Sequence, residues 1–366
     1  MINQTIILSA GGSGGHIFSA QALAEILIDR GYKVVLVTDR RGFEFAGKFP
    51  VEVKKYLLEL KNPWGHGSWN FIHALFLIFK SLIVSIYFIR SHYPSLVVGF
   101  GGYPSFPMLA AACLCRVPRF IHEQNSVLGR VNLIFAKLVT NLMFGISPKS
   151  LPKGLKKYKV VGNPVRKTFL DLPNKAYSIE PEGPYRILFL GGSQGAAAVS
   201  QLLPKAVGKL PNKIRSRLTV VHQCGKQSSA EIFRRYKAVG VKCDVRPFFE
   251  NVAKKLVESQ LVICRSGAAT ISELSIIGRP SILIPLPTAT GNHQYFNAKI
   301  LEKVGGAKII QQEKLGDDLL AAEITKILSR GSVARKMAEA TLDIGLPNAA
   351  CSLADIIISE IEKDKK

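Results

Sequence analysis

Short runs of apolar residues recur along the chain, and most are followed by a polar or glycine-rich turn and then by a helical pattern. The first run covers residues 5–10, and apolar positions at helical spacing follow over residues 20–30. Further runs that predict strands lie at residues 33–38, 96–100, 119–121, 187–190, 218–223, 241–248, 261–264 and 282–285. Strand-like runs that alternate with helices predict an α/β fold with doubly wound parallel sheets. Ligands of such sheets bind beyond the carboxyl ends of the strands, where these turns lie.

The turn after the first run has a counterpart in the second half of the chain. Gly11-Gly12-Ser13-Gly14-Gly15 follows the first strand, and Gly191-Gly192-Ser193-Gln194-Gly195 follows the strand at 187–190. The repeat predicts two Rossmann-like domains that face one another across a cleft, and the prolines and glycines between 163 and 185 indicate a linker. We therefore expect an N-terminal domain over residues 1–162 and a C-terminal domain over 163–347. A last helix, about 348–366, can pack back on the first domain.

The first glycine turn suits phosphate binding. Glycine lets the backbone approach a phosphate, and the start of the next helix offers N–H donors and the positive end of its dipole. The order GGSGGH is neither G-x-G-x-x-G nor a P-loop, so a tight turn without a ligand is the alternative. His16 is the only titratable side chain of the turn, and its near-neutral basicity suits a general base. A structural histidine and a ligand of an acceptor diphosphate are the other interpretations.

Composition narrows the range of partners. The chain has 49 Lys and Arg against 26 Asp and Glu, a net charge of +23, which suits nucleic acid, an anionic membrane surface or phosphorylated substrates. No helix-turn-helix, RNA-recognition signature or Cys/His finger accompanies this charge, so we expect no nucleic-acid partner. The six cysteines form no CxxC pair and no zinc spacing, and the start of the chain lacks a signal-peptide pattern. These features favour a reducing, cytoplasmic compartment.

The stretch 64–88 is long and apolar enough to approach a membrane span. Helical spacing predicts one side with Phe76, Phe79, Ile83 and Phe88, and another with His73, Lys80 and Ser81. A charge near the middle argues against full insertion. We expect shallow docking on an anionic membrane through Trp64, Trp69, Phe76, Phe79 and Lys80. The alternative is an ordinary helix that covers the first sheet and is buried on most sides.

A series of motifs in chain order resembles the MurG family of GT-B glycosyltransferases. The motifs are GGSGGH (11–16), GFGGYPS (99–105), HEQN (122–125), GNPVR (162–166), GGSQGA (191–196), CRSGAATISE (264–273) and HQYFNA (293–298). The resemblance implies an N-terminal domain for a lipid acceptor and a C-terminal domain for UDP-GlcNAc. It implies an inverting transfer of N-acetylglucosamine to the muramoyl sugar of lipid I, which gives lipid II and UDP in peptidoglycan synthesis. It further implies a peripheral enzyme on the cytoplasmic face of the bacterial inner membrane, in contact with the cell-wall and division machinery.

The resemblance and the chemistry together assign candidate site residues. The general base is His16 or Glu123, and the sequence does not decide between them. Glu273 is expected to accept the ribose hydroxyls, and Gln294 to bond the donor sugar. Phe248 and Phe249 are expected to flank the uracil, and Asn125 to contact the acceptor.

The charge of the leaving group needs its own partners. No Asp-x-Asp pair is present, so we expect no metal and no cofactor held by the protein, and helix starts with Arg166 to meet this charge. The remaining expected binding residues are Ser13, Gly14, Gly15, Ser193, Gln194, Arg265, Ala268, Ala269 and Thr270. The alternatives are a glycolipid synthase that uses diacylglycerol and a basic membrane or nucleic-acid binder without activity.

Overall fold

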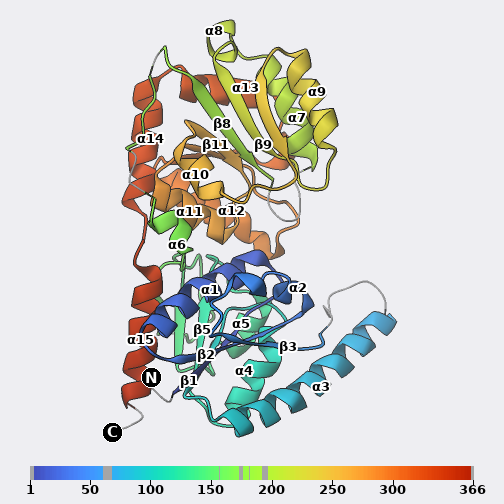
Figure 1. The fold of residues 1–366 in the computed structure, drawn as a ribbon, viewed down its shortest axis with the longest axis vertical. Coiled ribbons are helices and arrows are strands. Elements are labelled where there is room, and N and C mark those ends of the chain that lie inside the picture. The colour runs from blue at the N-terminus through green and yellow to red at the C-terminus, as the bar shows by residue number, and fades with distance from the viewer. Residues whose placement is uncertain are drawn as a thin grey trace. The chain divides into compact units, whose positions relative to one another are not determined.

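The structure, a computed structural model, describes residues 4–60, 68–155, 157–172, 176–180, 182–191 and 197–363. The chain divides into two compact units (Figure 1). Unit 1 comprises Met1–Lys167 and Leu346–Lys366, and unit 2 comprises Thr168–Gly345. Each unit is built on one parallel sheet with helices packed on its faces.

In the described part of unit 1 the sheet has seven parallel strands in the order β3-β2-β1-β4-β5-β6-β7. The strands are β1 (Thr5–Ser9), β2 (Lys33–Thr38), β3 (Lys54–Leu57), β4 (Leu96–Gly99), β5 (Arg119–Glu123), β6 (Asn141–Phe144) and β7 (Lys159–Val160). The strand order reverses between β1 and β4, so a crevice for ligands is expected beyond the carboxyl ends of these two strands.

The helices of unit 1 lie on both faces of this sheet. They are α1 (Gly14–Asp29), α2 (Arg40–Phe43), the 3-10 turn η1 (Ala46–Lys48), α3 (Ser68–His92), α4 (Ser105–Leu114), α5 (Arg130–Phe135) and α15 (Ala349–Lys363), with α6 (Lys167–Leu170) at the boundary. The last helix, α15, packs against α1 (Figure 1). Leu353 and Ile357 of α15 are buried in the same apolar cluster as β1 and α1, and Asp355 pairs with Arg30 at 2.5 Å. The end of the chain therefore completes the core of unit 1.

In the described part of unit 2 the sheet has six parallel strands in the order β10-β9-β8-β11-β12-β13. They are β8 (Tyr185–Leu190), β9 (Leu218–Gln223), β10 (Lys242–Arg246), β11 (Leu261–Cys264), β12 (Ser281–Leu283) and β13 (Ala307–Ile309). The helices and 3-10 turns are α7 (Ala197–Gly208), α8 (Asn212–Arg215), α9 (Ser229–Ala238), α10 (Val252–Val257), α11 (Ala268–Ile277), η2 (Thr290–Asn292), α12 (His293–Lys303), η3 (Gln312–Lys314), α13 (Asp317–Leu328) and α14 (Gly331–Asp343).

The structure confirms the predicted fold class of two doubly wound parallel sheets. The predicted strands at 33–38, 218–223 and 261–264 coincide with β2, β9 and β11. The helix predicted over 20–30 begins earlier, at Gly14, because the glycine turn leads directly into it. The strands β3, β6, β7 and β13 were not predicted, since they are short and three of them have polar or exposed positions. The facing arrangement of the two domains stays a prediction.

Candidate functional site

Two glycine turns meet at the carboxyl ends of β1 and β4 in unit 1. Ser105 binds the two turns together, because its hydroxyl lies 2.8 Å from the carbonyl oxygens of both Ser9 and Gly101. Gly12 and Gly102 each have a φ of 74°, in the left-handed region where glycine is favoured. The chain therefore needs glycine at both positions to bring the two turns together.

His16 lies in the first turn of α1, between these two turns. Its Nδ1 lies 2.8 Å from the carbonyl oxygen of Gly11. A carbonyl oxygen only accepts, so Nδ1 carries the hydrogen, and Nε2 of the neutral ring keeps its lone pair. The second glycine turn lies close to the imidazole ring, since a Cβ added to Gly102 would be 3.3 Å from Nδ1 of His16. In this tautomer the lone pair of Nε2 can accept a proton, as a general base must.

Glu123, the other candidate base, is buried at the end of β5. Its Oε1 accepts hydrogen bonds from the backbone and side-chain nitrogens of Asn125, both at 3.0 Å. Its Oε2 accepts from the backbone N–H of Gly129 and from Nδ2 of Asn132, both at 2.8 Å. Each oxygen thus has two donors, so the carboxylate organises the loop after β5. Asn132 was missed in the sequence because nothing around it marks it as a partner of Glu123.

The neighbouring His122 joins the same loop to the end of unit 1. Its Nε2 donates to the carbonyl oxygen of Gly162 at 2.9 Å, and its Nδ1 accepts from Nε2 of Gln124 at 3.2 Å. Burial lowers the pKa of His122 to about 4, against the opposing effects of the bond to Gly162 and the charge of Glu123, so the ring is neutral near pH 7. The side chain of Asn163 also donates to the backbone of Gln124, at 3.1 Å. These contacts hold the GNPVR segment against the HEQN segment.

The start of α1 is suited to an anion. Ser13 is its N-cap residue, but the Ser13 side chain makes no capping hydrogen bond, and the first turn, with Gly14 and Gly15, holds no acid. The backbone N–H groups there are available to a negatively charged group. Arg166 lies beside this helix, with its guanidinium 4.4 Å from the ring centre of Phe18. Unit 1 therefore places Arg166 beside the helix that begins with Gly14 and Gly15 after Ser13.

In unit 2, the start of α11 has the same character. Gly267 is the N-cap residue, no side chain caps the helix, and no acid lies in its first turn, Ala268 to Thr270. The segment that leads into α11 is held in place, because the hydroxyl of Ser266 donates to the carbonyl oxygen of Gln294 at 2.8 Å. Asn297 donates in turn to the carbonyl oxygen of Ser266, at 3.3 Å. This helix start is a candidate site for a diphosphate.

Other predicted donor residues lie around α11. Glu273 lies in its second turn and is half-buried, close enough to Cys264 that burial and then the charge of Glu273 raise the pKa of that thiol to about 12. Phe248 is 58% exposed, whereas Phe249 is 2% exposed and packs 4.6 Å from the Lys255 ammonium. Of the two rings, Phe248 is therefore the one that can stack on a base.

Arg265 and Gln294 have structural partners on the same side of unit 2. The guanidinium of Arg265 donates to the carbonyl oxygens of Ile284 and Pro285, at 3.0 and 3.1 Å, and to Oε1 of Gln312 at 2.6 Å. Oε1 of Gln294 accepts from the backbone N–H of Leu286 at 3.0 Å. Both side chains thus fix the loop after β12. A pocket of about 360 Å³ lies there, lined by Pro285, Leu286, Pro287, Ala289, Asn292, Tyr295, Gln311, Gln312 and Glu313.

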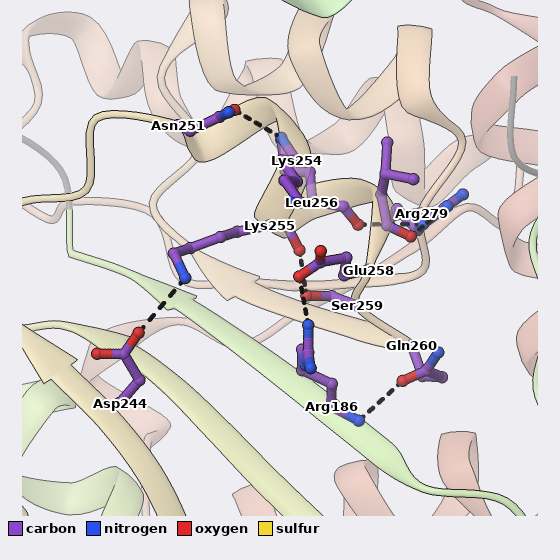
Figure 2. A network of polar contacts seen from close by, with 11 residues as sticks. Arg186, Asp244, Asn251, Lys254, Lys255, Leu256, Glu258, Ser259, Gln260 and Arg279 are labelled. Atoms are coloured by element: carbon purple, nitrogen blue, oxygen red, sulfur yellow. Dashed lines mark hydrogen bonds and ion pairs between the residues drawn. The ribbon is translucent and has the colours of Figure 1, made fainter. Parts of the chain in front are cut away.

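Arg279 joins α11, which carries Glu273, to α10, which follows the loop that carries Phe248 (Figure 2). It is buried, and its guanidinium donates to the carbonyl oxygens of Leu256 at 3.1 Å and Val257 at 2.6 Å, at the end of α10. It also donates to the carbonyl oxygens of Ile277 and Gly278 at the end of α11, both at 2.9 Å. Carbonyls at helix ends lack partners within the helix, so Arg279 satisfies both ends at once. Arg279 was missed in the sequence.

Helix α3 has large apolar side chains on its exposed side. Phe76 and Phe79 are 63% and 62% exposed, and Ile72, Leu75, Ile83, Val84 and Tyr87 are also exposed. The buried side consists mostly of small residues, Ala74, Ser81 and Ser85 with Ile89, and α3 packs against α4 (Figure 1). By length and composition, residues 72–92 are apolar enough to cross a membrane, with a mean hydropathy of 2.1 over a window that is 22% buried. The alternative of a helix buried on most sides is therefore wrong.

The predicted faces of α3 are partly wrong. Ser81 is buried and donates to the carbonyl oxygen of Glu59 at 3.2 Å, whereas Lys80 is exposed and pairs with the Glu59 carboxylate at 2.9 Å. Phe88 packs inward, with its ring stacked on His92 at 3.9 Å. Apolarity alone did not predict the buried side, because small residues occupy it.

Some of the predicted site residues lie outside the part of the chain that the structure describes. Trp64, Ser193 and Gln194 lie outside the described residues, and Trp69 lies in the first turn of α3 with its side chain outside the described part. Among the residues that the structure describes, no three His, Cys, Asp or Glu side chains gather as they would around a metal ion.

Comparison with known proteins identifies the family. The chain matches the Glycosyltransferase family 28 N-terminal domain over residues 6–144 and the corresponding C-terminal domain over residues 186–353. A protein of Caulobacter vibrioides named UDP-N-acetylglucosamine–N-acetylmuramyl-(pentapeptide) pyrophosphoryl-undecaprenol N-acetylglucosamine transferase is 42% identical over 361 residues, which cover 97% of this chain and 99% of that protein. A protein of the same name from Phenylobacterium zucineum is 40% identical and covers 97% and 98%.

Solved structures agree with this assignment. The crystal structure of Acinetobacter baumannii MurG has a TM-score of 0.79 at 28% identity and covers 97% of this chain and 99% of that chain. The calicheamicin glycosyltransferase CalG4, at 13% identity and a TM-score of 0.68 over 98% of both chains, shares the fold alone. The chain therefore belongs to glycosyltransferase family 28, within the MurG family.

Proposed function

We propose that this enzyme moves N-acetylglucosamine from UDP-GlcNAc to the muramoyl sugar of an undecaprenyl-diphosphate-linked acceptor, with inversion at the anomeric carbon. The enzyme is a hexosyltransferase, and its relatives carry the name of this GlcNAc transferase over nearly their full length. The observation that carries the proposed mechanism is the bond from Nδ1 of His16 to Gly11, which leaves Nε2 as a base at the carboxyl end of β1. The products are lipid II and UDP.

In the reaction, Nε2 of His16 takes the proton of the acceptor hydroxyl. The hydroxyl oxygen then forms a bond to the anomeric carbon of the donor, and the bond from that carbon to the UDP oxygen breaks with its electron pair on UDP. The four hydrogen bonds accepted by Glu123 support a different role for this residue, because a base needs an oxygen that is accessible to the substrate. We assign Glu123 to positioning Asn125, which is a candidate acceptor contact.

Unit 2 is the proposed donor unit. The uncapped start of α11 supports diphosphate binding, because its N–H groups and dipole stabilise the charge that develops on UDP. Glu273 is proposed to accept the ribose hydroxyls, Phe248 to stack on the uracil, and Gln294 to contact the sugar. The proposal requires no metal or cofactor resident in the protein.

Unit 1 is the proposed membrane-facing unit, on the cytoplasmic face of the inner membrane. The exposed aromatic side of α3 supports this proposal, as do Lys80 and Arg90 on the same helix. Aromatic rings favour the membrane interface, and each basic residue near an anionic leaflet adds about 1 kcal/mol of attraction. Because the other side of α3 packs on α4 and on Glu59, we propose that α3 lies on the surface and does not span the bilayer.

A transfer assay tests the proposed function. The purified full chain is given UDP-GlcNAc with either the muramoyl-pentapeptide lipid acceptor or diacylglycerol, and the products are identified by mass. We expect a product one N-acetylglucosamine heavier from the muramoyl acceptor and none from diacylglycerol. Transfer to diacylglycerol alone would assign the enzyme to glycolipid synthesis.

A further inference from the structure

The carboxylate of Asp39 joins the two glycine turns of unit 1, although no motif of the chain includes it. Asp39 follows β2, is the N-cap residue of α2, and is 1% exposed. Its Oδ1 accepts from the backbone N–H groups of Gly12 at 3.1 Å and Gly42 at 3.0 Å. Its Oδ2 accepts from the hydroxyl of Tyr103 at 2.5 Å. One side chain thus holds the turn after β1, the start of α2 and the turn after β4.

The bond to Gly12 connects Asp39 to His16 through a single peptide group. The N–H of Gly12 and the carbonyl of Gly11 belong to the same peptide, and that carbonyl accepts from Nδ1 of His16 at 2.8 Å. Hydrogen bonds in a chain polarise one another, so a carboxylate on the N–H makes the carbonyl oxygen a stronger acceptor. The arrangement corresponds to a carboxylate–histidine pair with a peptide group inserted between the two side chains.

The glycines around this chain of hydrogen bonds allow its parts to approach one another closely. A Cβ added to Gly102 would lie 3.1 Å from the Gly11 carbonyl oxygen and 3.3 Å from Nδ1 of His16. A Cβ added to Gly11 would overlap the Asp39 carboxylate. The peptide is therefore confined between Asp39 and His16, and a change at Asp39 has a direct path to the ring.

We propose that Asp39 is a positioning residue for His16, which it orients and holds in the Nδ1–H tautomer through the Gly11–Gly12 peptide. The inference rests on the proposed role of His16 as the base. Asp39 itself takes no proton in the reaction: the proton of the acceptor hydroxyl goes to Nε2 of His16. Tyr103 supports the carboxylate from the opposite side, so it belongs to the same chain of hydrogen bonds.

The test combines Asp39→Asn with Tyr103→Phe in the full chain. Asparagine keeps the size and the acceptor oxygen but removes the charge, and phenylalanine removes only the hydroxyl. For Asp39→Asn we expect kcat to fall ~10–100-fold, which is typical when a residue that orients a functional histidine is lost. The KM for UDP-GlcNAc should stay unchanged. For Tyr103→Phe we expect a smaller fall in kcat. Asp355→Asn is the matched control, because it removes a carboxylate of α15 that pairs with Arg30 at the end of α1, and it should leave kcat unchanged.

The ring nitrogens of His16 give a readout that does not depend on activity. In ¹⁵N NMR spectra, assigned by comparison with His16→Ala, the wild type should show a protonated Nδ1 and an unprotonated Nε2. In Asp39→Asn the two nitrogens should move towards averaged tautomer signals. Wild-type signals together with wild-type kcat in Asp39→Asn would overturn the proposal and leave Asp39 as a cap of α2.

Two further outcomes are also decisive. If Asp39→Asn does not fold, Tyr103→Phe takes its place, and an unchanged kcat and unchanged ring signals in that variant would overturn the proposal. If His16→Ala keeps the wild-type kcat, the base assignment fails. The tautomer signals then show separately whether Asp39 controls the ring.

Discussion

Replacing Arg279 with methionine should destabilise unit 2 and weaken the donor site. Methionine has similar length but no donor, so four buried carbonyl oxygens at the ends of α10 and α11 lose a partner. Hydrogen bonds to a charged group contribute ~1.5–3 kcal/mol each. The net loss is smaller than their sum, because burial also disfavours the cation and lowers the pKa of Arg279 to about 10. We expect a loss of about 3–5 kcal/mol, because a buried carbonyl left without a partner costs ~1–3 kcal/mol and that of Leu256 still accepts from the backbone N–H of Ser259.

Thermal unfolding measures this loss. For a unit of this size each kcal/mol shifts Tm by roughly 2–4 °C, so Tm of unit 2 should fall by roughly 6–20 °C. Arg279→Lys should recover only part of the difference, since one ammonium cannot reach the carbonyls of two helices as a planar guanidinium does. Arg186→Met is the matched control, because it removes an arginine of the same network that pairs with the partly exposed Glu258 (Figure 2) and should cost less than about 1 kcal/mol.

The result that would refute this reasoning is a Tm for Arg279→Met equal to that of Arg186→Met. The four carbonyls would then have found other partners, and Arg279 would not determine the relative placement of α10 and α11. UDP affinity gives a second measurement, since α11 carries Glu273 and the loop before α10 carries Phe248. We expect Arg279→Met to bind UDP more weakly at a temperature where unit 2 remains folded.

Three further predictions concern the donor site, acid stability and the membrane. Glu273→Ala should weaken UDP binding by roughly 10–100-fold, from the loss of ~1.5–3 kcal/mol of hydrogen bonding, whereas Glu231→Ala on α9 should not; equal affinities in calorimetry would refute the ribose assignment. His222 is buried in β9 of unit 2, and burial lowers its pKa to about 3. The unfolded chain therefore binds a proton that folded unit 2 excludes, and stability present above pH 6.5 is lost as the pH falls. Between pH 7 and pH 5 the loss should be about 2 kcal/mol for the unfolding of unit 2 in denaturant titrations, and it should disappear from that transition in His222→Gln. Unit 1 keeps a loss of its own from His122; the same slope for unit 2 in both proteins would contradict the assignment. Replacing Phe76 and Phe79 with serine should weaken sedimentation with anionic vesicles roughly tenfold or more, while Phe233→Ser in unit 2 should not; a parallel fall in Tm and in transfer to a water-soluble acceptor would show that the two rings belong to the core.

The fold was predictable because buried parallel strands leave continuous apolar runs and glycine turns mark their carboxyl ends. His16 and Glu273 were proposed as site residues for the same reason, since they lie in or just after such turns. Asp39, Asn132 and Arg279 were not found, because their roles depend on hydrogen bonds to residues distant in the sequence. The faces of α3 were misjudged because its small residues are buried and its large apolar residues are exposed, the reverse of the usual pattern.

The steady-state kinetics of His16→Ala test the proposed mechanism most directly. The substrates are UDP-GlcNAc and a short-chain, water-soluble acceptor, because such an acceptor removes any effect of membrane docking. Loss of a general base typically lowers the rate ~10²–10⁴-fold, so kcat should fall by that factor while the KM for UDP-GlcNAc stays unchanged. A kcat close to the wild-type value with a raised KM for the acceptor would contradict the mechanism: His16 would then be a ligand of the acceptor diphosphate, and another group would take the proton.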